Sequence, residues 1–111
     1  MLRTDLWVAA FVRRHNDIGS ICVVSRKGDP IAGQIFIEID HLNGTVSLLI
    51  PAPATAREDG DADRLFVRHL EHAEPAAVRE RIAREIAFDP DLWVLALEMR
   101  GDEAGVRVVR V

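Results

Sequence analysis

The chain has 111 residues, of which 49% are hydrophobic and 29% charged, and its formal net charge is −4. This length and composition predict one globular domain over residues 1–111, large enough to bury a core, and they exclude a disordered chain. No segment carries the stripe of basic residues that contacts with a phosphate backbone require, so we expect no nucleic-acid partner. The single cysteine, Cys22, excludes an internal disulfide, and its apolar neighbours in "SICVVS" indicate a small buried side chain.

The first predicted element is a helix from Thr4 to about Asn16. Thr4 can cap its first turn, Asp5 is favourable to the helix dipole, and Gly19 stands where a helix ends. The apolar run at residues 6–12 is too short to span a bilayer and lacks the flanks of a secretory signal. We therefore expect a cytoplasmic protein that makes no membrane contact.

A strand at "SICVVSR" and a turn at "KGDP" lead into two further strands joined by Asn43-Gly44. Asn-Gly is a strong signal for a two-residue type I′ turn, in which both residues have positive φ. This turn predicts a register in which His41 faces Val46. One face of the hairpin, expected to be core, then carries Ile35, Ile37, Ile39, Val46, Leu48 and Ile50.

The opposite face of this hairpin carries Glu38, Asp40, Thr45 and Ser47. A general acid–base pair of carboxylates needs such proximity, but exposed strand faces often show it without catalysis. His41 lies at the end of the core face, where we expect a packed ring with one nitrogen in water. A pH-sensing role for it has no second supporting observation.

Residues 51–63, "PAPATAREDGDAD", are predicted to form a long, mobile loop, in which residues 54–62 are the most mobile internal segment. Its last part resembles the start of an EF-hand, because three aspartates alternate at Asp59, Asp61 and Asp63. Arg64 stands where that calcium loop requires glycine, so we expect no specific calcium site.

The rest of the chain predicts a strand, a helix and two more strands. Residues 65–71 fit a strand or a helix, and we favour the strand. Pro75 suits the first turn of a helix, in which apolar residues recur at four-residue spacing from Val78 to Ile86. "LWVLALEM" predicts a strand buried on both faces, with Trp93 as a core anchor, and a hairpin at "RGDEAG" returns the chain as "VRVVRV". The fold class is α+β, a single mostly antiparallel sheet of about six strands with two helices, in the order α-β-β-β-β-α-β-β.

His69 and His72 form an HxxH pair and are the residues that we consider as metal ligands. Zinc needs three or four protein ligands, and this pair supplies two. On a strand, side chains three residues apart point to opposite sides. We therefore expect solvated turn residues, no bound metal and no other cofactor.

Several stretches in order along the chain are typical of one family: "LWVAAFVRR", "RKGD", "AGQIFIEI", "LNGTVSLL", "PAP" and "REIAFDPDLWVLALE". By these stretches the chain resembles a family of small alphaproteobacterial proteins known only as a domain of unknown function. The resemblance covers nearly the whole chain, and it implies no activity, cofactor or catalytic residue.

The function that we predict is a non-catalytic module that binds protein, itself first, as a homodimer. Two helices can cover one face of a sheet of about six strands, so the other face needs either one of those helices or a second copy packed by an isologous contact. The alternative is a small enzyme or anionic-ligand-binding domain with a pocket under the 51–63 loop. In that alternative, charge-assisted hydrogen bonds from Arg57, Arg64 and Arg68 would hold the ligand.

Overall fold

The computed structural model describes residues 2–53 and 64–110. Its elements, in chain order, are α1 (Thr4–Asp17), β1 (Ile21–Arg26), β2 (Ile35–Asp40), β3 (Val46–Pro51), β4 (Leu65–Ala73), α2 (Pro75–Phe88), β5 (Trp93–Glu98) and β6 (Arg107–Val108). The predicted order and the predicted α+β class are both confirmed. Most of the loop predicted at residues 51–63 lies outside the described residues, including Arg57 and the three alternating aspartates.

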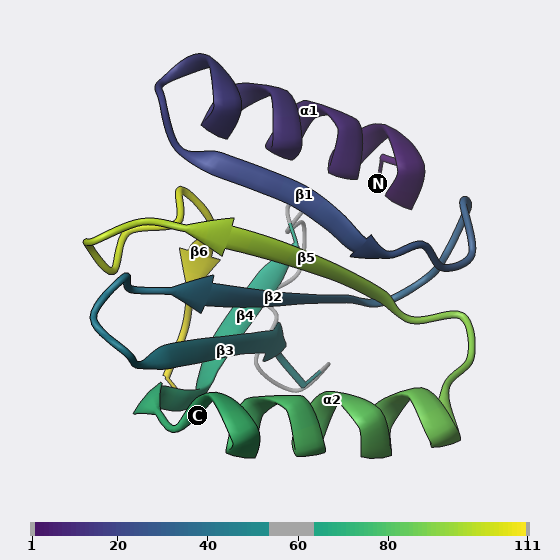
Figure 1. Ribbon diagram of the computed structural model, residues 1–111. Helices are drawn as coiled ribbons and strands as arrows, with labels where there is room; N and C mark the ends of the chain where they lie inside the picture. Colours follow the sequence, from purple (N-terminus) through teal and green to yellow (C-terminus); the bar gives the residue numbers. More distant parts are fainter. Residues whose placement is uncertain (1, 54–63, 111) are drawn as a thin grey trace.

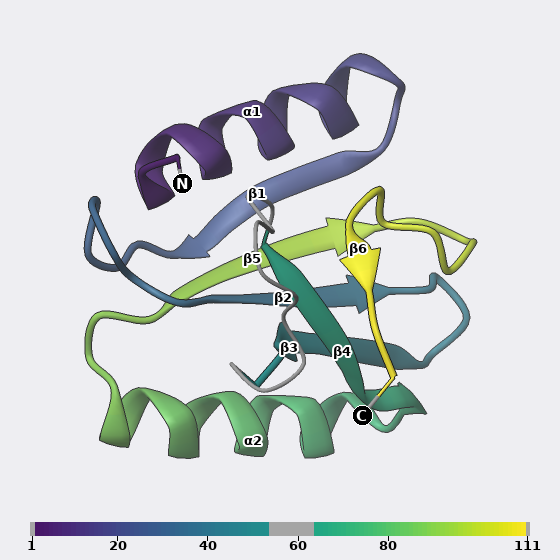
Figure 2. The ribbon, with the colours of Figure 1, turned by 180° about the vertical axis from the view of Figure 1, so that it is seen from behind.

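The strands form one six-stranded sheet in the order β1-β5-β2-β3-β4-β6. The pairs β1–β5, β2–β3 and β3–β4 are antiparallel, whereas β2–β5 and β4–β6 are parallel. The sheet is strongly twisted, so that β4 lies behind β2 and β3 in Figure 1 and in front of them in Figure 2.

The predicted return of the last strand as a hairpin partner of β5 is wrong. Both edges of β5 are already paired, one with β1 and the other with β2. The chain therefore crosses to the far edge of the sheet, where β6 adds to β4 in parallel over two residues.

The two helices pack on opposite faces of the sheet, and in Figure 1 they lie at opposite sides of the molecule. The core on the α1 side contains Val8, Phe11, Cys22, Ile35, Ile37, Ile39, Leu49, Phe66, Trp93, Leu95, Leu97 and Ala104. The core on the α2 side contains Phe36, Leu48, Val78, Leu92 and Val94. Each face of the sheet is thus covered by one helix. This is one of the two arrangements expected from the sequence, the other being a second copy packed on one face. The central strands are consequently buried on both faces, as predicted for β5.

In the hairpin, β2 and β3 pair in a register that is shifted by one residue from the predicted one. Asp40, not His41, faces Val46. Positive φ falls on Leu42 (63°) and not on Asn43, so the predicted type I′ turn is absent from this hairpin.

Side-chain hydrogen bonds explain this difference. Asp40 Oδ1 accepts a hydrogen bond from the backbone N–H of Leu42 (2.9 Å), and Asn43 Oδ1 accepts one from that of Thr45 (3.0 Å). Asp and Asn stabilise turns in this way, and here they hold a five-residue loop in place of a two-residue one.

A shift of one residue turns one strand over relative to the other. The predicted common core face is therefore wrong, because the apolar residues of β2 and β3 lie on opposite sides of the sheet. The α1 side receives Ile35, Ile37, Ile39 and Leu49, and the α2 side receives Val46, Leu48 and Ile50.

Thr4 does not cap α1 as predicted. The helix begins at Thr4 itself, and Arg3, at the N-cap position, makes no side-chain capping bond. The buried Thr4 hydroxyl donates instead to the carbonyl oxygen of Gly33 (2.9 Å), which fastens the start of α1 to the segment before β2. Asp5 lies in the first turn, as predicted, and Gly19 follows the helix with a φ of 92°.

Three further predictions are confirmed. Cys22 is buried, and burial raises the pKa of its thiol. Trp93 packs on the α1 side together with Leu95 and Leu97. Residues 65–71 lie within a strand.

No helix among the described residues is long and apolar enough to cross a membrane.

Candidate functional site

Two histidines and an aspartate come together at the end of the sheet where β2, β4 and β5 finish. His41 directly follows β2, His72 is the penultimate residue of β4, and Asp102 lies in the loop between β5 and β6. His72 Nε2 is 3.0 Å from Asp102 Oδ1, and His41 Nδ1 is 3.9 Å from the same oxygen. The two imidazole rings stack, with centroids 4.0 Å apart and planes inclined by 20°.

His41 is 2% exposed, so the prediction of one nitrogen in water is wrong. Its Nε2 is 2.7 Å from the hydroxyl oxygen of Ser47, which is also buried. Its Nδ1 is buried without a hydrogen-bond partner in the described part of the chain. A buried polar atom without a partner is costly, and such atoms are uncommon in folded proteins.

A β-bulge directs His72 toward this cluster. Val46 pairs with Ala73 and Leu48 pairs with Leu70, so that two residues of β4 lie opposite the single Ser47 of β3. Ser47 Oγ accepts a hydrogen bond from the backbone N–H of His72 (3.0 Å), and His72 has a φ of 45°. Bulges often re-aim a side chain in this manner. His72 is therefore solvent-exposed, as predicted, but it lies in a strand and not in a turn.

His69 does not join the cluster. Burial lowers the pKa of His69, and the positive charges of Arg81 and Arg84 lower it further, while Glu85 opposes them. Both arginines belong to α2, so His69 is on the α2 side of the sheet, whereas His72 contacts His41. The two members of the HxxH pair consequently have different surroundings.

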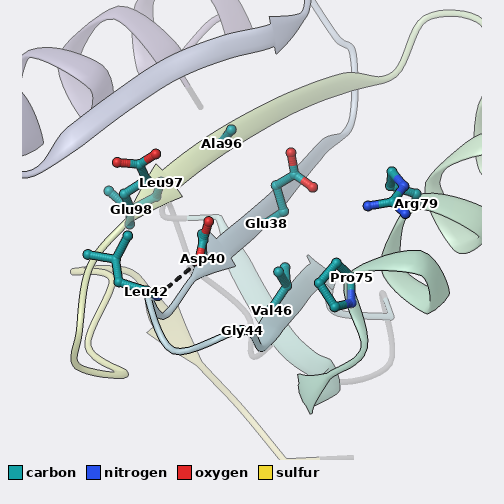
Figure 3. A pocket seen from close by; sticks show the side chains of 10 residues that line it. All are labelled: Glu38, Asp40, Leu42, Gly44, Val46, Pro75, Arg79, Ala96, Leu97 and Glu98. Atoms are coloured by element: carbon teal, nitrogen blue, oxygen red, sulfur yellow. Dashed lines mark hydrogen bonds between the residues drawn. The ribbon is translucent and has the colours of Figure 1, made fainter.

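A groove between α2 and the strands β2 and β5 is the second feature of the molecule (Figure 3). It consists of two cavities of about 510 and 520 Å³, both lined by Glu38 of β2 and Arg79 of α2. Asp40 and Glu98 line the first cavity, and Arg26 lines the second. The groove is therefore acidic where β2 and β5 end and basic where β1 ends.

Glu38 and Asp40 share a face, as the sequence predicts, and that face borders the groove. Burial raises the pKa of the Glu38 carboxyl, the neighbouring charge of Asp40 raises it further, and Arg79 opposes both effects. The charged form of Glu38 is thus disfavoured in the folded protein.

The helix α2 leaves part of its face of the sheet uncovered. It packs on β3 and β4, and the strand at the far edge, β1, receives no helix on this side. Ile21 and Val23 of β1 pair with Glu98 and Ala96, which line the groove. Ile21 is 57% exposed and Val23 is 52% exposed.

The structure places two of the three arginines considered for an anionic ligand. Arg64 donates a hydrogen bond to Thr4 Oγ1 (2.7 Å), and Arg68 lies 3.9 Å from a carboxylate oxygen of Glu71. Arg64 lines one small cavity and Arg68 lines two others. Arg57 lies outside the described residues, so the ligand-binding alternative stays a prediction.

Sequence reasoning missed Asp102 and Ser47. Asp102 belongs to the "RGDEAG" segment, which looks like an ordinary polar turn, and Ser47 alternates with apolar residues as any strand serine does. Their role depends on the spatial meeting of three chain segments, for which the sequence holds no local signal.

The fold is that of a small α+β domain, in which one helix packs on each face of a six-stranded sheet. The chain is similar to the crystal structure of a DUF1491 family protein from Caulobacter crescentus CB15, with 29% sequence identity, a TM-score of 0.79 and 98% of each chain covered. It is also similar to the solution structure of the protein Atu0922 from A. tumefaciens, with 31% identity, a TM-score of 0.85 and 99% and 96% of the two chains covered.

Residues 2–107 match the family described as "Protein of unknown function (DUF1491)". The chain belongs to the DUF1491 family, which confirms the resemblance seen in the sequence. No curated protein matches it.

Proposed function

We propose that this protein is a non-catalytic, cytoplasmic protein-binding module that first binds a second copy of itself through the α2 side of the sheet. The observation that carries the proposal is the exposure of Ile21 (57%) and Val23 (52%) beside a groove. Single exposed apolar residues are common, but adjacent ones next to a groove are typical of interaction surfaces.

We expect the second copy to contact the exposed face of β1 and not its free edge. At the free edge, the Asn16 side chain forms hydrogen bonds with both the backbone N–H and the carbonyl of Cys22. The backbone N–H of Ser20 donates to the carbonyl of His15. These bonds occupy groups that an added strand would need, so simple sheet extension at this end of β1 is disfavoured.

The charges of the groove favour a second copy as the partner. One end carries Asp40 and Glu98, and the other carries Arg26. In an isologous contact, a residue i of one copy meets a residue j of the other, and j meets i, so a two-fold axis that crosses the groove at right angles at its middle places the acidic end of one copy over the basic end of the other. The apolar residues Ile21 and Val23 then contribute the buried area.

Sedimentation velocity over a wide range of protein concentrations tests this proposal. We expect a monomer–dimer equilibrium for the natural chain and a monomer for Val23→Lys, because the lysine would place a charge in the apolar contact. Ile31→Lys is the matched control, since Ile31 is 61% exposed in the segment between β1 and β2. A natural chain that stays monomeric at millimolar concentration, or equal weakening by both variants, would contradict the proposal.

A further inference from the structure

We propose that His41, His72 and Asp102 bind one divalent transition-metal ion, with zinc as the first candidate. None of these three residues lines the groove, and the proposal does not depend on the proposed self-association. The sequence led us to expect no metal, because His72 lacked a third ligand nearby. The tertiary structure supplies both His41 and Asp102.

The spacing of the three ligand atoms suits a tetrahedral ion. One ligand atom from each of the three residues lies within 4.8 Å of the other two. Zinc bonds of about 2.0–2.1 Å place neighbouring tetrahedral ligands about 3.3 Å apart. Asp102 Oδ1 is 3.0 Å from His72 Nε2 and 3.9 Å from His41 Nδ1, values that bracket this separation.

The hydrogen-bond partners of His72 indicate a cation between its Nε2 atom and Asp102. Thr45 Oγ1 donates its one hydrogen to Asn43 Oδ1 (2.6 Å), so it can only accept from His72 Nδ1, at 3.3 Å. A neutral His72 with its proton on Nδ1 has a lone pair on Nε2. That lone pair then faces the carboxylate oxygen of Asp102 at 3.0 Å. Two acceptors at this distance need a proton or a metal ion between them.

His41 supplies a second, independent observation. Its Nδ1 is fully buried, lacks a hydrogen-bond partner among the described residues and lies 3.9 Å from Asp102 Oδ1. A bound ion would satisfy this nitrogen. Its other nitrogen, Nε2, could donate to Ser47 Oγ at 2.7 Å, and metal-bound histidines commonly have such a partner.

Binding requires the His72 ring to turn out of its stack on His41. Because the rings stack with planes 20° apart, an ion held by both histidines would lie outside the plane of at least one of them. The His72 side chain is 47% exposed and can tilt, whereas His41 is held in the core. A cavity of about 240 Å³, lined in part by His72 and Asp102, leaves room for water at a fourth position.

Isothermal titration of the full, tag-free chain with zinc chloride tests the site. Magnesium chloride serves as the control ion, because Mg²⁺ prefers oxygen ligands. We expect one zinc per chain and no binding of magnesium. His72→Ala and Asp102→Asn should each weaken zinc binding at least tenfold, and both replaced side chains are partly exposed, so that the fold is kept. Titration with cobalt(II) should give the visible absorption of a tetrahedral site in the natural chain and lose it in both variants.

His69→Ala is the matched control, because it also removes one histidine from β4 but lies outside the cluster. It should bind zinc like the natural chain. The proposal is overturned if the natural chain binds no zinc, if His69→Ala weakens binding as much as His72→Ala, or if Asp102→Asn binds zinc with unchanged affinity.

Discussion

The side-chain amide of Asn16 pairs with the backbone of Cys22 as a neighbouring strand would. Asn16 Oδ1 accepts a hydrogen bond from the Cys22 N–H at 2.9 Å, and Asn16 Nδ2 donates one to the Cys22 carbonyl at 3.0 Å. Natural sheets commonly protect their edges against uncontrolled strand addition. Here the last turn of α1 does so for β1.

We therefore expect Asn16→Ala to lower stability and to promote aggregation. Leaving half-buried backbone groups without partners costs about 1–3 kcal/mol for each group that water cannot reach. Urea unfolding would measure the loss, and light scattering at rising concentration would measure the exposed edge. Asp17→Ala, at the next and exposed position, should change neither. Unchanged stability of Asn16→Ala would show that this edge needs no cover.

Trp93→Ala should reduce the free energy of unfolding by about 3–5 kcal/mol, as for other large core aromatics. The indole is 4% exposed on the α1 side, and its Nε1 donates to the carbonyl of Asp29 (2.7 Å). Trp93→Phe, which keeps most of the apolar contact and loses the hydrogen bond, should cost less. Thermal unfolding would separate these effects. A natural melting temperature for Trp93→Ala would contradict the core role.

Glu38→Gln should raise the melting temperature by a few degrees at pH 7. Burial and Asp40 raise the pKa of Glu38 in the folded protein, so its stabilising contribution is fully present below the unfolded pKa of about 4.3. That contribution is lost as the pH rises through the folded pKa, and an uncharged glutamine avoids this loss. The advantage of Glu38→Gln should therefore shrink as the pH falls toward 4. Glu80→Gln, on the exposed side of α2, should show no such trend.

Gly28→Ala should strongly destabilise the fold, because a Cβ at this position would overlap the backbone carbonyl of Asp91. The clash is with backbone, so it cannot be relieved by rotation of a side chain. Gly101→Ala is the control, since the nearest atom to its Cβ would be the flexible end of Met99 at 3.7 Å. Chemical denaturation of both variants would compare them. Equal stabilities would mean that the segment around Gly28 can move away from Asp91.

The order of elements was predictable from the sequence because each element has a local cause. Pro75 starts α2, four-residue spacing sets its apolar side, and the apolar run from Leu92 identifies β5 as buried on both faces. The position of Trp93 in the core follows from that run alone. Contacts within one segment decide these features, so the segment's own residues are enough to predict them.

The register of the β2–β3 hairpin could not be obtained in this way. Asn43-Gly44 favours a two-residue turn, but the side chains of Asp40 and Asn43 stabilise a longer loop, and a shift of one residue then exchanges the two faces. The longer loop also lets β2 and β3 contribute apolar residues to both helices. The Asn-Gly pair favours one turn and these side-chain hydrogen bonds favour the other, so the turn residues alone do not set the register.

By itself, the sequence determined the α+β class, the element order and the buried β5 strand, since these depend on local periodicity. The tertiary structure decided where β6 pairs, because β1 and β2 already occupy both edges of β5. It also decided that the two histidines and the aspartate of the cluster come together. His41, His72 and Asp102 are 30 or more residues apart and meet only because β2, β4 and β5 end at the same side of the sheet. A bulge of one residue in β4 then turns His72 toward His41, and the free energy that holds this bulge comes from the packed sheet around it.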